Sequence, residues 1–134
     1  MNEQAAREWL SKAWHNISGA KLFYEADHYT DVTAVELHYG VEKILKALIA
    51  FQNKKIPKTH DIYELYKQVD NLLDLEYSLD LMDQITRYHI EEAYPAYNRN
   101  PPPKEEIKKV LDFSNALLKE VCNILGISIE EITA

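Results

Sequence analysis

Apolar residues recur at intervals of three and four along almost the whole chain, and this spacing places them on one face of an α-helix. The first stretch with this spacing contains Ala6, Trp9, Leu10, Ala13, Ile17, Ala20 and Phe23. The same pattern returns over residues 34–51, 81–93 and 107–125. We find no strand candidate, and only three glycines and five prolines occur among 134 residues, which disfavours turn-rich β architectures. The chain is therefore predicted to be all-α, an up-and-down helical bundle of four to five helices.

Polar residues mark the boundaries of the first three predicted helices. The polar segment 27–31 separates the first two helices, and Thr33 with Glu36 is a candidate capping box at the start of the second. The second helix must end before Pro57, because proline lacks a backbone donor and restricts the residue before it. Asp61 is a candidate N-cap for a third, shorter helix that extends to about residue 73.

The second half of the chain is divided by prolines. Ser78 is predicted to begin a fourth helix, and Pro95 to end it. Residues 95–103 hold four of the five prolines and are predicted to form a loop. The last helix is expected to start near Pro103 and to stop at Gly126. We predict a single domain over residues 1–134, in which 126–134 form a C-terminal tail or a short turn.

Charge and cysteine content limit the class of protein. The net charge of −7 argues against a general binder of nucleic acid, so no DNA partner is expected. Cys122 is the sole cysteine, which rules out an intramolecular disulfide and suits a reducing compartment. No signal peptide is evident, and the apolar stretch 41–51 is too short and too charged to span a membrane. We expect a cytoplasmic protein without a membrane partner.

The residues that could support catalysis do not form a known site in the sequence. The five histidines (His15, His28, His38, His60 and His89) include no His-Glu-x-x-His and no two histidines four apart in one helix. We therefore expect no metal site, and His38, which lies on an apolar face, is interpreted as a hydrogen-bonded core histidine. Cys122 is interpreted as a buried thiol, and no Gly-rich phosphate loop is present. No catalytic residue and no cofactor are predicted.

Two polar groups of residues remain candidates for binding. Glu42 and Lys46 are four residues apart in the favourable order for a surface ion pair on a helix. Lys58 and His60 lie in a loop that leads into a helix N-terminus, where backbone donors could add to a small anion site. The alternative interpretation of this loop is a helix cap with a solvated lysine.

These two groups, at this separation, resemble the HEPN family (the higher-eukaryote and prokaryote nucleotide-binding domain) from about residue 9 to residue 95. Short motifs carry the resemblance: Trp9-Leu10 with Ala13 and Asn16, Asp27-His28-Tyr29, Val41-Glu42-Lys43 with Leu45-Lys46-Ala47, Pro57-Lys58-Thr59-His60-Asp61 with Leu65, and Tyr94-Pro95. The resemblance implies a helical bundle that commonly pairs as a homodimer, often beside a separately encoded small nucleotidyltransferase. A surplus of aromatic side chains, whose exposed face would suit an oligomer interface, agrees with a dimer.

The chain departs from the nuclease members of this family. Those members carry an Arg followed after four to six residues by a His, and none of Arg7, Arg87 and Arg99 has a histidine at that distance. The chain therefore resembles the branch without this ribonuclease motif. Within that branch, Ala93 stands where an arginine usually precedes Tyr-Pro, and Ala96 where an acidic residue commonly follows it.

The leading functional hypothesis is a non-catalytic, dimeric binding module that acts with a small nucleotidyltransferase in a toxin–antitoxin-like pair. One alternative is a nucleotide-binding protein whose phosphate contacts come from the basic residues Lys43, Lys46, Lys58, His60 and Arg87. A further alternative is a ribonuclease with a non-standard site built from His60, His89 and Arg87.

Overall fold

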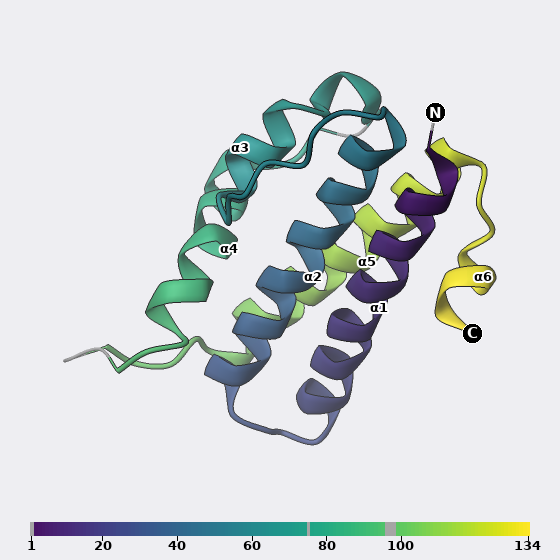
Figure 1. The fold of residues 1–134 in the computed structure, drawn as a ribbon. Coiled ribbons are helices and arrows are strands. Elements are labelled where there is room, and N and C mark those ends of the chain that lie inside the picture. Colours follow the sequence, from purple (N-terminus) through teal and green to yellow (C-terminus); the bar gives the residue numbers. More distant parts are fainter. Residues whose placement is uncertain (1, 75, 96–98) are drawn as a thin grey trace.

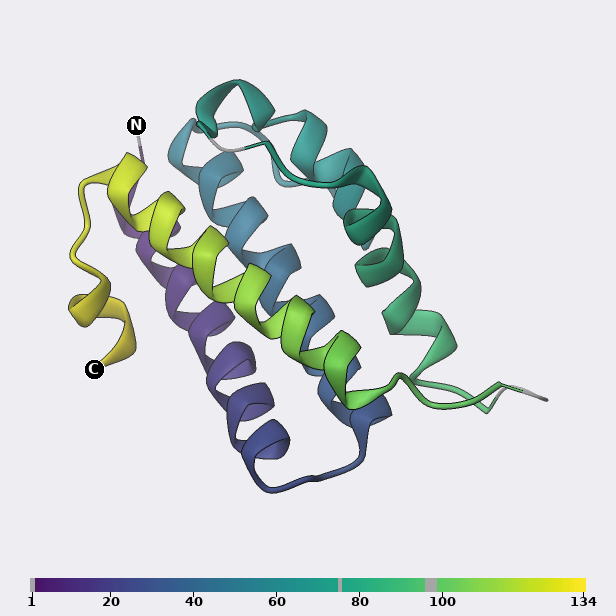
Figure 2. The ribbon, with the colours of Figure 1, turned by 180° about the vertical axis from the view of Figure 1, so that it is seen from behind.

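The computed structural model describes residues 2–74, 76–95 and 99–134, and these residues form helices and loops without a β-strand (Figure 1). In chain order the elements are α1 (Glu3–Glu25), α2 (Thr30–Phe51), α3 (Ile62–Lys67), the 3-10 helix η1 (Asp70–Leu72), α4 (Leu79–Glu91), α5 (Lys104–Leu125) and α6 (Ile129–Thr133). The four longest helices α1, α2, α4 and α5 run in alternating directions along the bundle (Figures 1 and 2). The prediction of an all-α helical bundle is confirmed.

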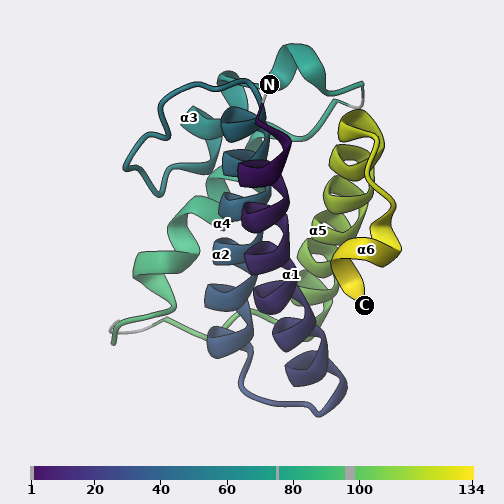
Figure 3. The same ribbon diagram turned by 45° about the vertical axis from the view of Figure 1, so that its right-hand side comes forward.

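Helix α2 lies at the centre of the bundle. It packs against α1 most extensively, and also against α5, α4 and α3. Figure 2 shows α5 lying across the back of α1 and α2, while α4 runs along the outer side of α2. The short α6 folds back beside α1 (Figure 3). Because neighbours surround α2, its buried residues include polar ones: Thr33, His38, Glu42 and Lys46.

The close contact between α1 and α2 depends on Gly40. A Cβ added at this glycine would lie 2.6 Å from Ile17 Cγ1 of α1, well inside van der Waals contact. The absence of a side chain at position 40 therefore lets α2 approach α1 closely enough for their apolar faces to interlock.

Most of the predicted helix boundaries agree with the structure. Asp61 Oδ1 accepts a hydrogen bond from Glu64 N at 3.2 Å, and Ser78 Oγ accepts one from Leu81 N at 3.3 Å, so both residues are N-caps. Helix α5 begins after Pro103 and ends at Gly126, which has a left-handed backbone with φ of 69°. Residues 126–134 form a short turn of helix, α6, one of the two predicted possibilities.

Two boundary predictions were wrong. Helix α2 already begins at Thr30, so Thr33 lies inside it and its hydroxyl donates to Tyr29 O instead of capping. Glu36 accepts a hydrogen bond from Asn16 of α1, a tertiary contact that competes with the local capping box. Helix α3 ends at Lys67 and is followed by η1, so the third helix is shorter than predicted.

Among the described residues, no helix combines the length and the apolar character that a bilayer-spanning helix requires.

Candidate functional site

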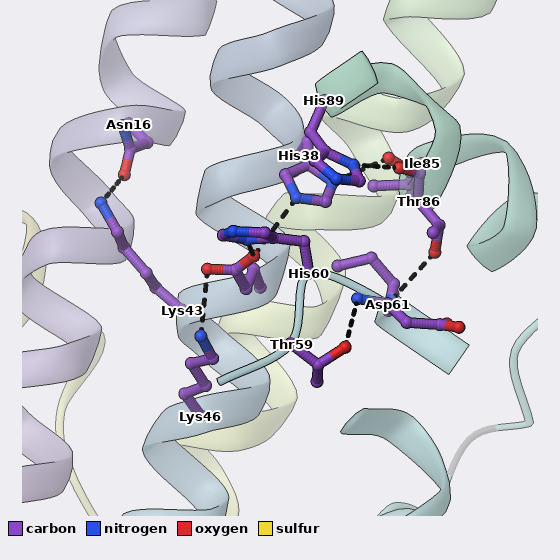
Figure 4. Close-up of polar contacts among 12 residues, drawn as sticks. Asn16, His38, Lys43, Lys46, Thr59, His60, Asp61, Ile85, Thr86 and His89 are labelled. Carbon is purple, nitrogen blue, oxygen red and sulfur yellow. Dashed lines mark hydrogen bonds and ion pairs between the residues drawn. The ribbon is translucent and has the colours of Figure 1, made fainter. Parts of the chain in front are cut away.

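Three polar residues follow one another at four-residue intervals along α2. The first two face α4 and the loop 52–61, since His38 bonds the carbonyl of Ile85 and Glu42 bonds His60 (Figure 4). His38, Glu42 and Lys46 are 0%, 4% and 7% exposed. The prediction that Glu42 and Lys46 form a surface pair was therefore wrong. The two residues do pair, with Lys46 Nζ 3.2 Å from Glu42 Oε2, but they do so in the interior, since the loop and the neighbouring helices cover this part of α2.

The carboxylate of Glu42 is the centre of the site. Its Oε1 atom lies 2.6 Å from His60 Nδ1 and 3.3 Å from His38 Nε2, and its Oε2 atom accepts the hydrogen bond from Lys46. Burial of the carboxyl group raises its pKa, but the hydrogen bonds from His38 and His60 and the charge of Lys46 outweigh burial and lower the pKa from 4.5 to about 2. Glu42 is therefore ionised at neutral pH.

His89 of α4 completes a group of three imidazole rings. Its ring stacks on the ring of His38, with centroids 4.7 Å apart and planes inclined by 20°, and its centroid lies 5.0 Å from that of His60. His89 Nδ1 donates to Thr86 O at 2.6 Å. We call His38, Glu42, Lys46, His60 and His89 the histidine–glutamate cluster.

The loop that carries His60 is held on both sides of this residue. Thr59 Oγ1 accepts a hydrogen bond from Asp61 N at 3.1 Å, and the Asp61 side chain caps α3. Thr86 Oγ1 of α4 accepts a hydrogen bond from Ile62 N at 2.9 Å. These bonds tie the loop to α4 and fix the direction in which His60 enters the cluster.

Of the five residues predicted to bind nucleotide, the structure brings together Lys46 and His60. Lys43 points toward α1, where its Nζ donates to Asn16 Oδ1 at 2.7 Å (Figure 4). Lys58 is exposed in the loop. Arg87 forms ion pairs with Asp83 and Glu91 along α4.

Glu42, the centre of the site, was not predicted from the sequence as a site residue, and His89 was predicted to join His60 only in the alternative ribonuclease site. The spacing of His38, Glu42 and Lys46 was the available signal, because polar residues at i, i+4 and i+8 share one face of a helix, here an otherwise apolar one. His89 had no comparable signal, since only the packing of α4 beside α2 brings it to the cluster.

The interpretations of His38 and Cys122 as buried residues are confirmed. His38 is inaccessible to solvent and hydrogen-bonded to the Ile85 carbonyl, as expected of a core histidine. Cys122 is buried in α5, and burial raises the pKa of its thiol, so the thiol is protonated at neutral pH.

Comparisons with known proteins place this bundle in a family. The family model described as "HEPN domain" matches residues 6–125, which is most of the chain. The chain belongs to the HEPN family. Among curated proteins, none matches it in sequence.

A solved structure with the same fold is the crystal structure of TT1696 from Thermus thermophilus. It superposes on this HEPN domain with a TM-score of 0.71 at 24% sequence identity, over 92% of this chain and 99% of TT1696. The similarity extends over nearly all of both chains, so the two proteins share the whole bundle and not a single helical hairpin.

The three arginines of this HEPN domain lie in ion pairs outside the histidine–glutamate cluster. Arg7 pairs with Glu3 and Glu131, and Arg99 pairs with Glu91 at 2.8 Å. Arg87 precedes His89 by two positions, which correspond to a rotation of about 200° around the helix axis. The two side chains therefore leave α4 on nearly opposite faces. Ala93, which stands where the family usually has an arginine, lies just beyond α4, and Ala96 lies outside the described residues.

Proposed function

We propose that this HEPN domain is a binding module without ribonuclease activity, which forms a homodimer and acts beside a separately encoded small nucleotidyltransferase. The observation that carries the first part is the placement of Arg87. Cleavage of RNA by an Arg–His pair requires a cation at the phosphate that the histidine serves, because charge develops there in the transition state. Here Arg87 turns away from His89 and is neutralised by Asp83 and Glu91.

An RNA cleavage assay tests the absence of nuclease activity. We expect purified protein to leave single-stranded RNA intact. Cleavage that is lost in the double variant Arg87→Ala/His89→Ala, and kept in the exposed-histidine control His15→Ala, would instead support a non-standard ribonuclease site with His60. Cleavage that is equal in all three proteins would identify a contaminating nuclease.

Exposed aromatic side chains support the proposed homodimer. Tyr29, at the start of α2, is 74% exposed, and Tyr94, just after α4, is 68% exposed. The two tyrosines line the same surface hollow with Pro95 and Pro101, and polar and charged residues complete its lining: Thr30, Asp31, Glu91, Glu92 and Arg99. Ile90 of α4 is a further large apolar side chain in contact with solvent. Large apolar side chains gathered in this way are typical of surfaces that a second copy covers.

Size-exclusion chromatography with light scattering tests the dimer. We expect a dimer at micromolar concentration and a shift toward monomer in Tyr94→Asp. The matched control is Tyr63→Asp, which adds the same charge at an exposed tyrosine of α3 that does not line this hollow. A wild-type protein that is strictly monomeric would contradict the proposal.

We propose the nucleotidyltransferase partner because members of this family often act beside such an enzyme, in toxin–antitoxin-like pairs. Co-expression with the protein encoded by the adjacent gene tests it. We expect that gene to encode a small nucleotidyltransferase and the two proteins to co-elute. An adjacent gene of another class, or two proteins that elute separately, would contradict this part.

Nucleotide binding is a second candidate function, favoured by one observation. Lys46, His60 and His89 converge from three different segments on one place, where an ammonium group and two imidazole rings could contact a phosphate. Calorimetric titration with ATP, GTP and AMP tests it, with His60→Ala as the variant and the exposed Lys54→Ala as the control. An absence of heat and of thermal shift at millimolar nucleotide would exclude this candidate.

A further inference from the structure

The hydrogen bonds of His38 leave its second ring nitrogen facing a carboxylate. His38 Nδ1 lies 2.8 Å from Ile85 O. A carbonyl oxygen only accepts, so Nδ1 carries a proton. In the neutral ring Nε2 then carries a lone pair, and this nitrogen lies 3.3 Å from Glu42 Oε1. An imidazole lone pair and a carboxylate oxygen that face each other at this distance are both donors that a metal ion can bind.

His60 brings a third donor atom to the same place. The atoms His38 Nε2, Glu42 Oε1 and His60 Nδ1 all lie within 4.8 Å of one another. Two imidazoles and one carboxylate form one of the ligand sets of catalytic zinc sites, in which the fourth position stays open. We propose that His38, Glu42 and His60 bind a divalent transition-metal ion, with Zn²⁺ the best match to these donors. This inference goes beyond the binding-module function and does not depend on it.

The donor distances are close to those that a tetrahedral ion requires. Two ligands bound to Zn²⁺ at about 2.0–2.1 Å, at tetrahedral angles, lie roughly 3.3 Å apart. His38 Nε2 and Glu42 Oε1 already have this separation. His60 Nδ1 and Glu42 Oε1 are 2.6 Å apart, a hydrogen-bond distance, so the ion would displace the shared proton and move His60 outward by less than ~1 Å.

The elements around the three donors suit a metal site. His38 and Glu42 are one turn apart on the buried helix α2, so their backbone positions are fixed before an ion binds. The Ile85 carbonyl orients the His38 ring through its other nitrogen, as outer-shell partners of metal-bound histidines do. Lys46 holds Glu42 Oε2 and leaves Oε1 free for the ion. The His60 side chain is 55% exposed, which gives an ion a path from solvent and His60 room to adjust.

Lys46 influences the charge of the ligand that the metal-loaded site would bind. A divalent ion beside Lys46 and one carboxylate gives the site a net positive charge, so an anionic ligand or hydroxide is favoured at the open position. His89 lies against the rings of His38 and His60 and covers one side of the site.

Calorimetric titration of chelator-treated protein with ZnCl₂ tests the site. We expect one ion per chain and a loss of affinity of roughly 100-fold or more in His60→Ala, since even outer-shell changes cost 10–100-fold. His60 is exposed, so this variant keeps the fold, which circular dichroism verifies. The matched control is His15→Ala, which removes an exposed histidine of α1 and should bind like the wild type.

Co²⁺ absorption provides a second readout that does not depend on activity. We expect the intense visible bands of four- or five-coordinate Co²⁺ in wild type and in His15→Ala, and only the weak bands of hydrated Co²⁺ in His60→Ala. The inference is overturned if Zn²⁺ fails to bind at ~100 µM, a concentration far above what three protein ligands need. It is equally overturned if His60→Ala binds Zn²⁺ as tightly as the wild type, because His60 is then not a ligand of the ion.

Discussion

Replacement of Glu42 by glutamine is the sharpest test of how the histidine–glutamate cluster stabilises the fold. The change keeps the side-chain shape and removes the charge. The Glu42 pKa falls from 4.5 to about 2, and each pKa unit corresponds to roughly 1.4 kcal/mol, so the interactions of the charged form amount to about 3 kcal/mol. Mutational data on buried ion pairs give a similar value, since removal of one partner destabilises the fold by about 3–5 kcal/mol. Since a glutamine amide can donate to His38 Nε2, we expect the lower end, about 3 kcal/mol.

Urea denaturation at pH 7 measures this loss, with Glu105→Gln as the control on an exposed first turn of α5. The control should change the free energy of unfolding by less than about 0.5 kcal/mol. A double-mutant cycle with Lys46→Met isolates the ion pair, and its coupling energy should reach about 1–3 kcal/mol. A loss below about 1 kcal/mol for Glu42→Gln, without coupling to Lys46, would refute the view that this carboxylate stabilises the core.

Three further predictions concern acid stability and packing. Because the folded-state pKa of Glu42 is lowered, the stability that its carboxylate contributes is fully present above its ordinary pKa of 4.5 and is lost as the pH falls toward about 2. The free energy of unfolding should therefore fall less steeply with decreasing pH in Glu42→Gln than in the wild type. Identical acid limbs of the two stability–pH profiles would disprove this. Gly40→Ala should cost about 1–3 kcal/mol because its Cβ would meet Ile17 of α1 at 2.6 Å, and thermal unfolding measures the effect; an unchanged melting temperature would show that α1 shifts freely. Tyr77→Phe should cost about 1 kcal/mol in urea denaturation, since the Tyr77 hydroxyl donates to the Glu120 carboxylate, and no change would mean that water replaces this bond without loss.

The bundle itself was predictable because the signals for helices are local. An apolar residue every three or four positions specifies a helix and its buried face within a single segment. The N-caps Asp61 and Ser78 and the stop at Gly126 act within one turn of the helices they bound, so they too were identified correctly. The false capping box at Thr33 shows the limit of this reasoning, because Glu36 is held by Asn16 from another helix.

The site was decided by tertiary structure. The sequence supplied His38, Glu42 and Lys46 on one face of a helix, but burial of this face depends on the packing of α2 among four neighbours. The contacts that complete the cluster join residues far apart in the chain: 18 positions separate Glu42 from His60, and 47 separate His38 from Ile85. Loss of one partner of a charged pair costs a few tenths of a kcal/mol on a surface but about 3–5 kcal/mol once the pair is desolvated. The same residues therefore affect stability differently according to what covers them.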